Sequence, residues 1–190
     1  RGLLRALDLG YQQEEISKYR ASHIFQDIVS DETSLTLCYE IPARDFSRGG
    51  EASGKVKRAL QRLGGRPQIV RRVAIATYEA EINIVIHSER GGEIVADVRP
   101  DRVWITATDD GPGIEDVEAV RKPGFSTAPG WIRELGFGAG MGLTNIEKCA
   151  DEFRMQSKLG VGTRLDIIVY LKQEERLGRG MASSEDEVDA

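Results

Sequence analysis

Residues 67–88 are predicted to form a helix that is apolar over most of its surface. Pro67 suits the first position of such a helix. The apolar residues fall on nearly every side of it: Ile69, Val70, Val73, Ile75, Ala76, Ile82, Ile84, Val85 and Ile86. Because a surface helix needs only one apolar stripe, this helix is expected at the centre of the fold, with neighbours on several sides.

Short apolar runs on either side of this helix predict the remaining elements. Strands are expected at residues 36–41, 93–98, 103–108, 153–158 and 163–171, and helices at residues 51–63, 114–120 and 141–151. The last four strands follow one another as two hairpins with no crossover helix inside either pair. The expected fold class is therefore α+β, a two-layer sandwich in which a mostly antiparallel mixed sheet carries helices on one face, and a Rossmann fold is disfavoured.

The composition divides the chain into three parts. Residues 1–32 are mixed and polar, and we expect an N-terminal helical extension that packs on a partner or on a second copy of the chain, which leaves a homodimer open. Residues 33–172 hold all the predicted strands and form the expected domain. Residues 173–190 predict a disordered acidic tail. Inside the domain, residues 121–140 are rich in Gly and Pro and predict a mobile loop.

The bulk composition argues against several classes of partner. With 40% hydrophobic and 30% charged residues, the chain can bury a core. A net charge of −5 and an aromatic content of 6% argue against a nucleic-acid partner. No apolar run reaches the roughly 20 residues that span a bilayer, so no membrane partner is expected. Cys38 and Cys149 lack metal-ligand spacing, and we expect reduced, buried thiols in a cytoplasmic protein.

Two polar residues interrupt the apolar helix. Glu79 and Asn83 are four residues apart and therefore leave the helix on the same face. The amide oxygen of Asn83 is a suitable ligand for magnesium, and the Glu79 carboxylate can accept a proton from an attacking hydroxyl. The alternative is that Glu79 caps or pairs locally and that Asn83 is a satisfied buried amide. Glu81 points elsewhere, and we expect it to be solvated or salt-bridged.

Three glycine-bearing stretches follow this pair. Asp109 ends a strand ahead of Gly111 and Gly113, where a carboxylate can accept a hydrogen bond from an exocyclic amine and the glycines leave room for a flat ring. The stretch Gly138-Ala139-Gly140-Met141-Gly142-Leu143 leads into a helix whose exposed N–H groups favour phosphates. Lys122 could pair with a phosphate and Thr163 could back the base, whereas plain turns and a surface charge are the alternatives. Together these stretches predict a pocket for a nucleotide with magnesium.

The order of these motifs resembles the GHKL (Bergerat-fold) ATPase superfamily over residues 34–171, and the subgroup most similar is the anti-sigma regulatory serine/threonine kinases of the switch-kinase type. The resemblance implies ATP and Mg²⁺ as cofactors. It implies that Asn83 holds the metal, that Asp109 binds adenine and that Glu79 is the general base. It also implies that Gly111 and Gly113 line the base and that Gly138, Gly140 and Gly142 contact phosphates. The further candidates for the nucleotide site are Lys122, Met141, Leu143 and Thr163.

The resemblance implies a protein serine/threonine kinase that phosphorylates a small antagonist protein, with a sigma-like factor or a phosphatase as further partners. The ATP-binding domain of a histidine kinase is one alternative, although Ser22-His23-Ile24-Phe25 lacks the acidic neighbour of a phosphoacceptor histidine. An ATP-gated clamp and a nucleotide-dependent binding module without turnover are the others. The switch kinases have a shorter loop here, and the insert at residues 128–135 lengthens it, which bears on the protein substrate more than on ATP.

Overall fold

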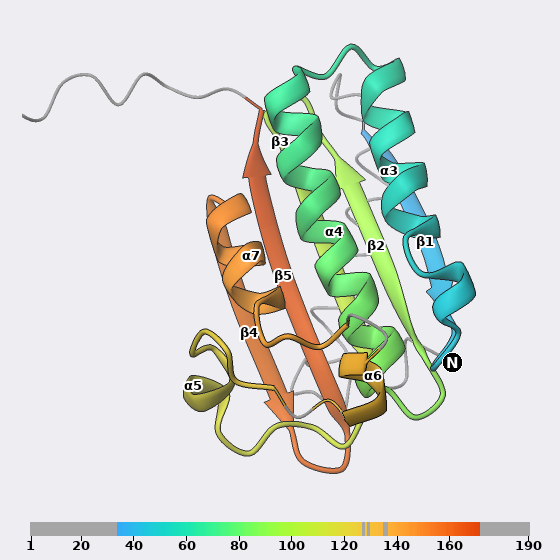
Figure 1. Cartoon of the computed structure of the whole chain (residues 1–190). Helices are drawn as coiled ribbons and strands as arrows, with labels where there is room; N and C mark the ends of the chain where they lie inside the picture. Colours follow the sequence, from blue (N-terminus) through green and yellow to red (C-terminus); the bar gives the residue numbers. More distant parts are fainter. Residues whose placement is uncertain (1–33, 127, 129, 135–136, 172–190) are drawn as a thin grey trace, which may run out of the picture.

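The structure, a computed structural model, describes residues 34–126, 128, 130–134 and 137–171. These residues form two layers, a five-stranded sheet and a row of helices packed on one of its faces (Figure 1). The strands are β1 (Leu35–Ile41), β2 (Gly92–Val98), β3 (Arg102–Asp109), β4 (Glu152–Lys158) and β5 (Gly162–Tyr170). They lie in the order β1-β2-β3-β5-β4, and all four neighbouring pairs are antiparallel.

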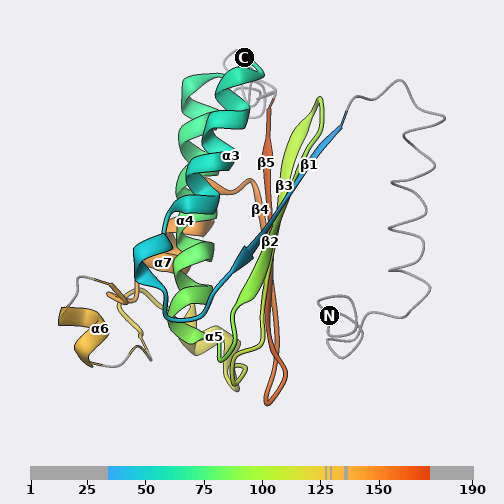
Figure 2. The same ribbon diagram turned by 90° about the vertical axis from the view of Figure 1, so that its right-hand side faces the viewer.

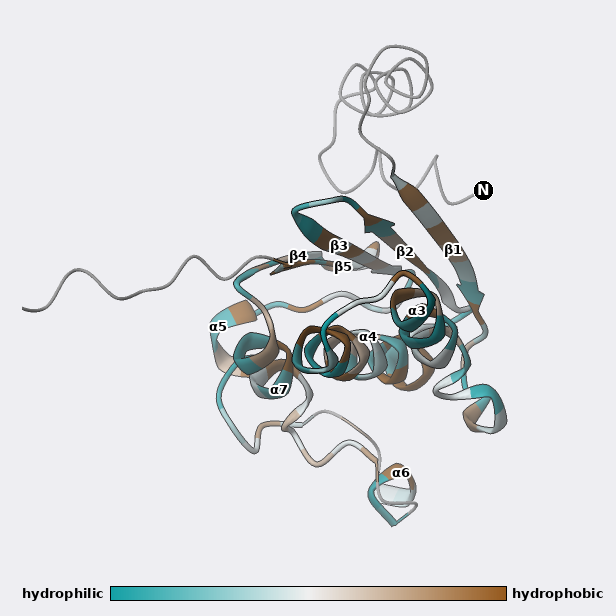
Figure 3. Cartoon of the chain, turned by 90° about the horizontal axis from the view of Figure 1, so that it is seen from above, coloured by the Kyte–Doolittle hydropathy of each residue, from teal (hydrophilic) through white to brown (hydrophobic). Residues whose placement is uncertain are grey.

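Three helices make the second layer, side by side on the same face of the sheet (Figures 2 and 3). They are α3 (Glu51–Arg62), α4 (Pro67–His87) and α7 (Gly142–Cys149), with α4 in the middle. Shorter helical turns lie outside this row: η1 (Phe46–Arg48), α5 (Val117–Val120) and α6 (Gly130–Glu134). Within the part of the chain that the structure covers, no helix combines the length and apolar character needed to cross a bilayer.

The prediction of a two-layer α+β sandwich with helices on one face is confirmed. The sheet is antiparallel throughout the described strands, so the mixed pairing expected from the sequence is not found. The helix expected at residues 114–120 is only the single turn Val117–Val120. The predictions for residues 1–32 and 173–190 fall outside the described residues.

The central position of α4 follows from its apolar surface. Val73 and Ala76 have no exposed surface, and Ile84 is 2% exposed. Side chains of α4, α3 and the inner sheet face form one core cluster, which α7 joins through Ile146. Burying a side chain such as Ile84 is worth about 1.5–3 kcal/mol, so α4 supplies much of the driving force for folding.

Both cysteines are free thiols, as predicted, but Cys38 is exposed on β1 and not buried.

Glu81 is buried, at 1% exposure, and not solvated or salt-bridged as the sequence suggests. Its carboxylate accepts hydrogen bonds from the backbone N–H groups of Ala52 and Ser53, both at 3.0 Å. These N–H groups belong to the first turn of α3, whose N-cap residue, Gly50, has no side chain to accept from them. The Glu81 carboxylate therefore caps α3 from the neighbouring helix α4. The positive end of the α3 dipole stabilises the buried charge.

We expect Glu81→Gln to lower the free energy of unfolding by about 1–2 kcal/mol, because the amide keeps the shape but offers only one acceptor oxygen to two N–H groups. Urea unfolding at pH 7 measures the change. Glu89→Gln, an exposed position just past α4, is the control and is expected to change the value by less than about 0.5 kcal/mol. An unchanged midpoint for Glu81→Gln would contradict the capping role.

The lid segment, residues 121–140, holds more structure than the predicted loop. Its helix α6 places Ile132, at 1% exposure, in a small cluster with Ile82 and Ile86 of α4. Phe46 of η1 joins them and meets the ring of Trp131 edge-on at 5.9 Å between centroids. Trp131 stays half exposed, at 50%. The described part of the lid segment therefore packs on α4, on the side away from the sheet (Figure 3).

Candidate functional site

The polar face of α4 meets the start of α7. A Cβ placed on Gly142 would lie 3.3 Å from Glu79 Oε2 and 3.4 Å from Asn83 Oδ1. The two oxygens therefore flank the space above the first residue of α7, as the four-residue spacing predicts. Both side chains are half-buried. This space, lined by a carboxylate, an amide oxygen and the first backbone N–H groups of a helix, is the first half of the candidate site.

Asn145 also belongs to this group, and the sequence reasoning misses it. Its side-chain Nδ2 donates a hydrogen bond of 2.7 Å to Glu79 Oε1. The signal in the sequence is its spacing, because a residue three positions after Gly142 lies one helical turn away, on the same face of α7. The contact leaves Glu79 Oε2 as the oxygen that faces Gly142.

A second contact fixes the other end of α7. Arg72 lies two turns before Glu79 on α4 and donates from Nε to the carbonyl oxygen of Cys149 at 2.9 Å. Its guanidinium also pairs with Asp151 at 2.8 Å. A cation at a helix C-terminus is favourable, and the pair holds the end of α7 against α4. Two residues of α4 thus hold α7 in place: Glu79 bonds to Asn145 in its first half, and Arg72 bonds to Cys149 at its end.

The second half of the candidate site lies at the end of β3. Asp109 Oδ1 accepts hydrogen bonds from the backbone N–H of Gly111 at 2.8 Å and of Thr163 at 3.3 Å. The Thr163 hydroxyl lies 3.0 Å from Ser157 Oγ. Gly111 packs on the carbonyl oxygen of His87, and Gly113 packs on that of Lys158. Asp109, Gly111, Gly113 and Thr163 therefore come together, as predicted, although Thr163 reaches Asp109 through its backbone.

Asp110, the neighbouring acid, has a structural part. Its carboxylate is buried, accepts from the backbone N–H groups of Glu89 and Arg90, and pairs with the Arg90 guanidinium at 2.8 Å. These contacts lower its pKa, against the effect of burial. Asp109 differs, because burial raises its pKa to about 6 and the two N–H donors only partly offset this. The environments of the two acids therefore shift their pKa values in opposite directions, and Asp109 is the one that takes up a proton at an unusually high pH, about 6.

The raised pKa of Asp109 predicts a pH dependence of stability. An acid whose pKa is higher in the folded state binds a proton more tightly there, so its contribution is fully present below the unfolded value and is lost as the pH rises through about 6. We expect the wild type to gain on the order of 1–2 kcal/mol relative to Asp109→Asn between pH 7 and pH 4.5. Urea unfolding of both proteins at the two pH values measures this difference. A difference that does not change with pH would contradict the assignment.

The two halves of the site lie along one helix. His87, whose carbonyl oxygen touches Gly111, is one turn beyond Asn83 and two turns beyond Glu79 on α4. At 1.5 Å per residue, Glu79 and His87 are about 12 Å apart along the axis. Along the axis of α4, the Asp109 group therefore lies beside His87, followed by Asn83 and then by Glu79. This spacing suits a ligand with a flat ring at one end and phosphates at the other.

The glycine stretch, residues 138–142, ends the lid segment and leads into α7 beside the polar face of α4. The carbonyl oxygen of Gly140 accepts a hydrogen bond of 3.0 Å from the N–H of Gly124. The φ angle of Gly140 is +73°, and a Cβ there would lie 2.5 Å from the backbone of Gly124, so only glycine is accommodated. Gly138 packs on Ala128 of the lid segment. The two ends of the lid segment are thereby held together at the start of α7.

The remaining predicted residues have different surroundings. Met141 is exposed at 37% and precedes the first turn of α7, where its carbonyl oxygen accepts from the N–H of Asn145. Leu143 is half-buried and packs on the main core, so only its backbone N–H is available to a ligand. Lys122 is exposed, two residues before Gly124. Its side chain is open to solvent, and the nearby Gly124 bonds to Gly140 of the glycine stretch.

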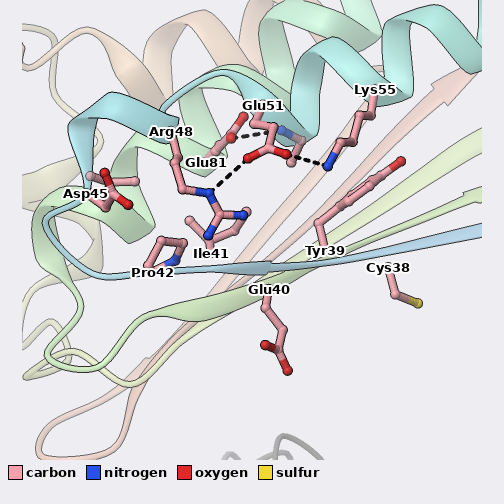
Figure 4. Close-up of a pocket in the computed structure, with 12 residues that line it drawn as sticks. Cys38, Tyr39, Glu40, Ile41, Pro42, Asp45, Arg48, Glu51, Lys55 and Glu81 are labelled. Carbon is pink, nitrogen blue, oxygen red and sulfur yellow. Dashed lines mark hydrogen bonds and ion pairs between the residues drawn. The ribbon is translucent and has the colours of Figure 1, made fainter.

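A separate pocket of about 290 Å³ lies between β1, η1 and the start of α3 (Figure 4). Arg48 and Lys55 line it and both pair with Glu51, and the buried Glu81 is another lining residue. None of the predicted nucleotide-binding residues lines this pocket. It is therefore distinct from the candidate site, which we place from its hydrogen bonds and close approaches.

The side-chain oxygens at the candidate site suit a magnesium ion that also binds phosphates. No cluster of three or more His, Cys, Asp or Glu side chains suited to a metal occurs among the residues that the structure describes. Magnesium, however, keeps several waters and binds through one or two protein oxygens together with substrate phosphates. Asn83 Oδ1, above Gly142, would be such an oxygen.

The sequence matches the family described as "Histidine kinase-like ATPase domain" over residues 45–169, and the chain belongs to this family.

Three named proteins are similar to about half of this chain. The serine/threonine-protein kinase RsbT of Bacillus subtilis is 35% identical over 104 residues, which cover 53% of this chain and 72% of RsbT. The anti-sigma F factor of Anoxybacillus flavithermus is 35% identical over 104 residues, covering 52% of this chain and 68% of that protein. The anti-sigma F factor of Pasteuria penetrans is 36% identical over 102 residues, covering 50% and 63%. Among solved structures, the histidine kinase AdeS of Acinetobacter baumannii aligns at 14% identity with a TM-score of 0.42, covering 83% of this chain and 77% of that one.

Proposed function

We propose that this chain is an ATP-dependent protein kinase of the anti-sigma regulatory type, which transfers a phosphoryl group to a serine or threonine of an antagonist protein. The observation that supports it best is the meeting of Glu79 Oε2 and Asn83 Oδ1 above Gly142, at the start of a helix. Membership in the ATPase family and the similarity to a kinase named for serine and threonine support the same function. A sigma-like factor or a phosphatase is the further partner that we propose.

In this proposal, the residues at the end of β3 hold the base. The Asp109 carboxylate accepts a hydrogen bond from the exocyclic amine of adenine, while the backbones around Gly111 and Gly113 lie against the ring. The first N–H groups of α7, together with Gly138, Gly140 and the Lys122 side chain, neutralise the phosphates. Asn83 would hold a magnesium ion, which supplies charge neutralisation to the phosphates when bound.

Glu79 serves as the general base of the transfer. The hydroxyl oxygen of the acceptor serine or threonine forms a bond to the γ-phosphorus, and the bond from that phosphorus to the bridging oxygen breaks. ADP leaves with the electron pair of the broken bond. The hydroxyl proton passes to Glu79 Oε2, the oxygen that Asn145 leaves uncovered. Phosphorylation then changes the antagonist's complexes through its added charge.

One experiment separates this function from its alternatives. The chain is incubated with γ-labelled ATP, magnesium and candidate antagonist proteins, and the labelled residue is identified. Acid-stable label on serine or threonine supports the kinase, whereas acid-labile label on histidine favours a histidine kinase domain. Phosphate release without protein labelling favours an ATP-gated clamp, and tight ATP binding with neither product favours a binding module. Each of the last three outcomes would contradict the proposed transfer.

A further inference from the structure

The hydrogen bond from Asn145 to Glu79 has a consequence for which carboxylate oxygen reacts. A free carboxylate presents two equivalent oxygens and rotates between them. In this structure Glu79 Oε1 is occupied at 2.7 Å by the Asn145 side-chain amide, and Glu79 Oε2 faces Gly142 and Asn83. The two oxygens therefore have different surroundings before any ligand binds, since the contact that distinguishes them lies within the chain.

The donor is itself held in place. Asn145 lies in the first half of α7, where its backbone N–H bonds to the carbonyl oxygen of Met141 at 2.8 Å. Arg72 holds the other end of α7 through Cys149 and Asp151. Both Arg72 and Glu79 project from α4, two helical turns apart. Because Arg72 holds the end of α7 against α4, the Asn145 side chain stays within hydrogen-bonding reach of Glu79.

The chemistry of an amide suits this position. The side-chain NH₂ of asparagine donates a hydrogen bond but has no proton to lose or gain near neutral pH. It therefore orients the carboxylate without competing for the proton that Glu79 is proposed to accept. A lysine or arginine in the same place would add a positive charge beside the metal position, and an aspartate would add a second negative charge.

We propose that Asn145 is a positioning residue for the proposed kinase reaction, fixing the Glu79 carboxylate so that Oε2 alone is presented to the acceptor hydroxyl. This inference rests on the proposed function, since it assigns a part in the same transfer. Asn145 acts through Glu79 and not on the nucleotide. Its removal is therefore expected to lower kcat and to leave the KM for ATP nearly unchanged.

Steady-state kinetics of phosphoryl transfer test this directly. We expect Asn145→Ala to lower kcat about tenfold with the KM for ATP within twofold, and Lys148→Ala, an exposed position on the same helix, to change neither. In a Glu79→Ala background, Asn145→Ala should cause no further loss, because the group through which it acts is gone. A loss that persists in that background, or one that falls mainly on the KM, would overturn the assignment.

The pH profile gives a second measurement. In Asn145→Asp two carboxylates lie within hydrogen-bonding distance, and two such groups share a proton over a wide pH range. The acidic limb of the pH–rate profile is then expected to move to higher pH, by one unit or more. A variant that is slower at every pH with an unmoved profile would contradict the contact.

A measurement on the ligand-free protein separates this inference from the proposed function. In nitrogen-resolved NMR spectra of the ligand-free protein, Glu79→Gln should shift the Asn145 side-chain NH₂ signals, because it replaces the oxygen that accepts their hydrogen bond, whereas Glu89→Gln should leave them in place. If no protein is phosphorylated but the shift is present, the kinase proposal fails and the contact stands. If transfer occurs but the signals are insensitive to Glu79→Gln, the positioning role of Asn145 is wrong.

Discussion

Glu79→Gln is expected to lower the rate of phosphoryl transfer by about 10²- to 10⁴-fold, the range that a positioned general base contributes. The amide keeps the size of the side chain and its contact to Asn145, since an amide oxygen also accepts a hydrogen bond from Nδ2. What it loses is the ability to take the hydroxyl proton. The affinity for ATP is therefore expected to stay within about threefold, and the thermal midpoint within about 2 °C.

The measurement combines single-turnover transfer to the antagonist protein with calorimetric binding of ATP. Glu89→Gln is the matched control, because it makes the same chemical change on an exposed residue just past α4. An equal fall in transfer and in ATP affinity would mean that Glu79 holds the metal or the phosphates rather than accepting the proton. Full activity in Glu79→Gln would show that the reaction needs no base at this position, which a loose transition state of phosphoryl transfer allows.

The helices and strands were predictable because their signals are local. The apolar surface of residues 67–88 and the Gly and Pro residues between elements place α4 and most of the strands within one or two residues of their observed ends. The position of β5 between β3 and β4 was not predictable, because strand pairing depends on contacts between distant residues. Helix α6 was missed for the same reason, since Ile132 gains its burial from Ile82 and Ile86 of α4.

The candidate site divides in the same way. The spacing of Glu79 and Asn83 specifies a shared face, and the structure places both beside Gly142 as expected. Glu81, two residues away, was misjudged because its acceptors are backbone N–H groups of α3, and nothing in its own neighbourhood indicates them. The contact of Asn145 with Glu79 could not be predicted without knowing that α7 packs against α4. Periodicity thus gives the direction of a side chain, while its partner comes from the packing of helices.

Gly142→Ala is expected to reduce the magnesium-dependent affinity for ATP on the order of a hundredfold, which corresponds to about 2.7 kcal/mol. The added methyl group would lie 3.3 Å from Glu79 Oε2 and 3.4 Å from Asn83 Oδ1, in the space that the metal and phosphates are proposed to occupy. The backbone of Gly142 has no positive φ angle, and alanine favours a helix over glycine by about 1 kcal/mol. Both neighbouring atoms end side chains that can shift by a few tenths of an ångström, so the variant is expected to fold.

Gly54→Ala provides a matched control, because it makes the same change inside α3, where a Cβ meets only the flexible end of Arg58 at 3.4 Å. We expect it to bind ATP normally and to raise stability slightly. Calorimetry with and without magnesium, together with thermal unfolding, separates the two variants. Asn83→Ala should remove the magnesium dependence without filling the space, so its remaining affinity should equal that of the wild type in excess chelator. If Gly142→Ala binds Mg·ATP as the wild type does, the phosphates lie elsewhere and the roles of Asn83 and of the start of α7 are both wrong.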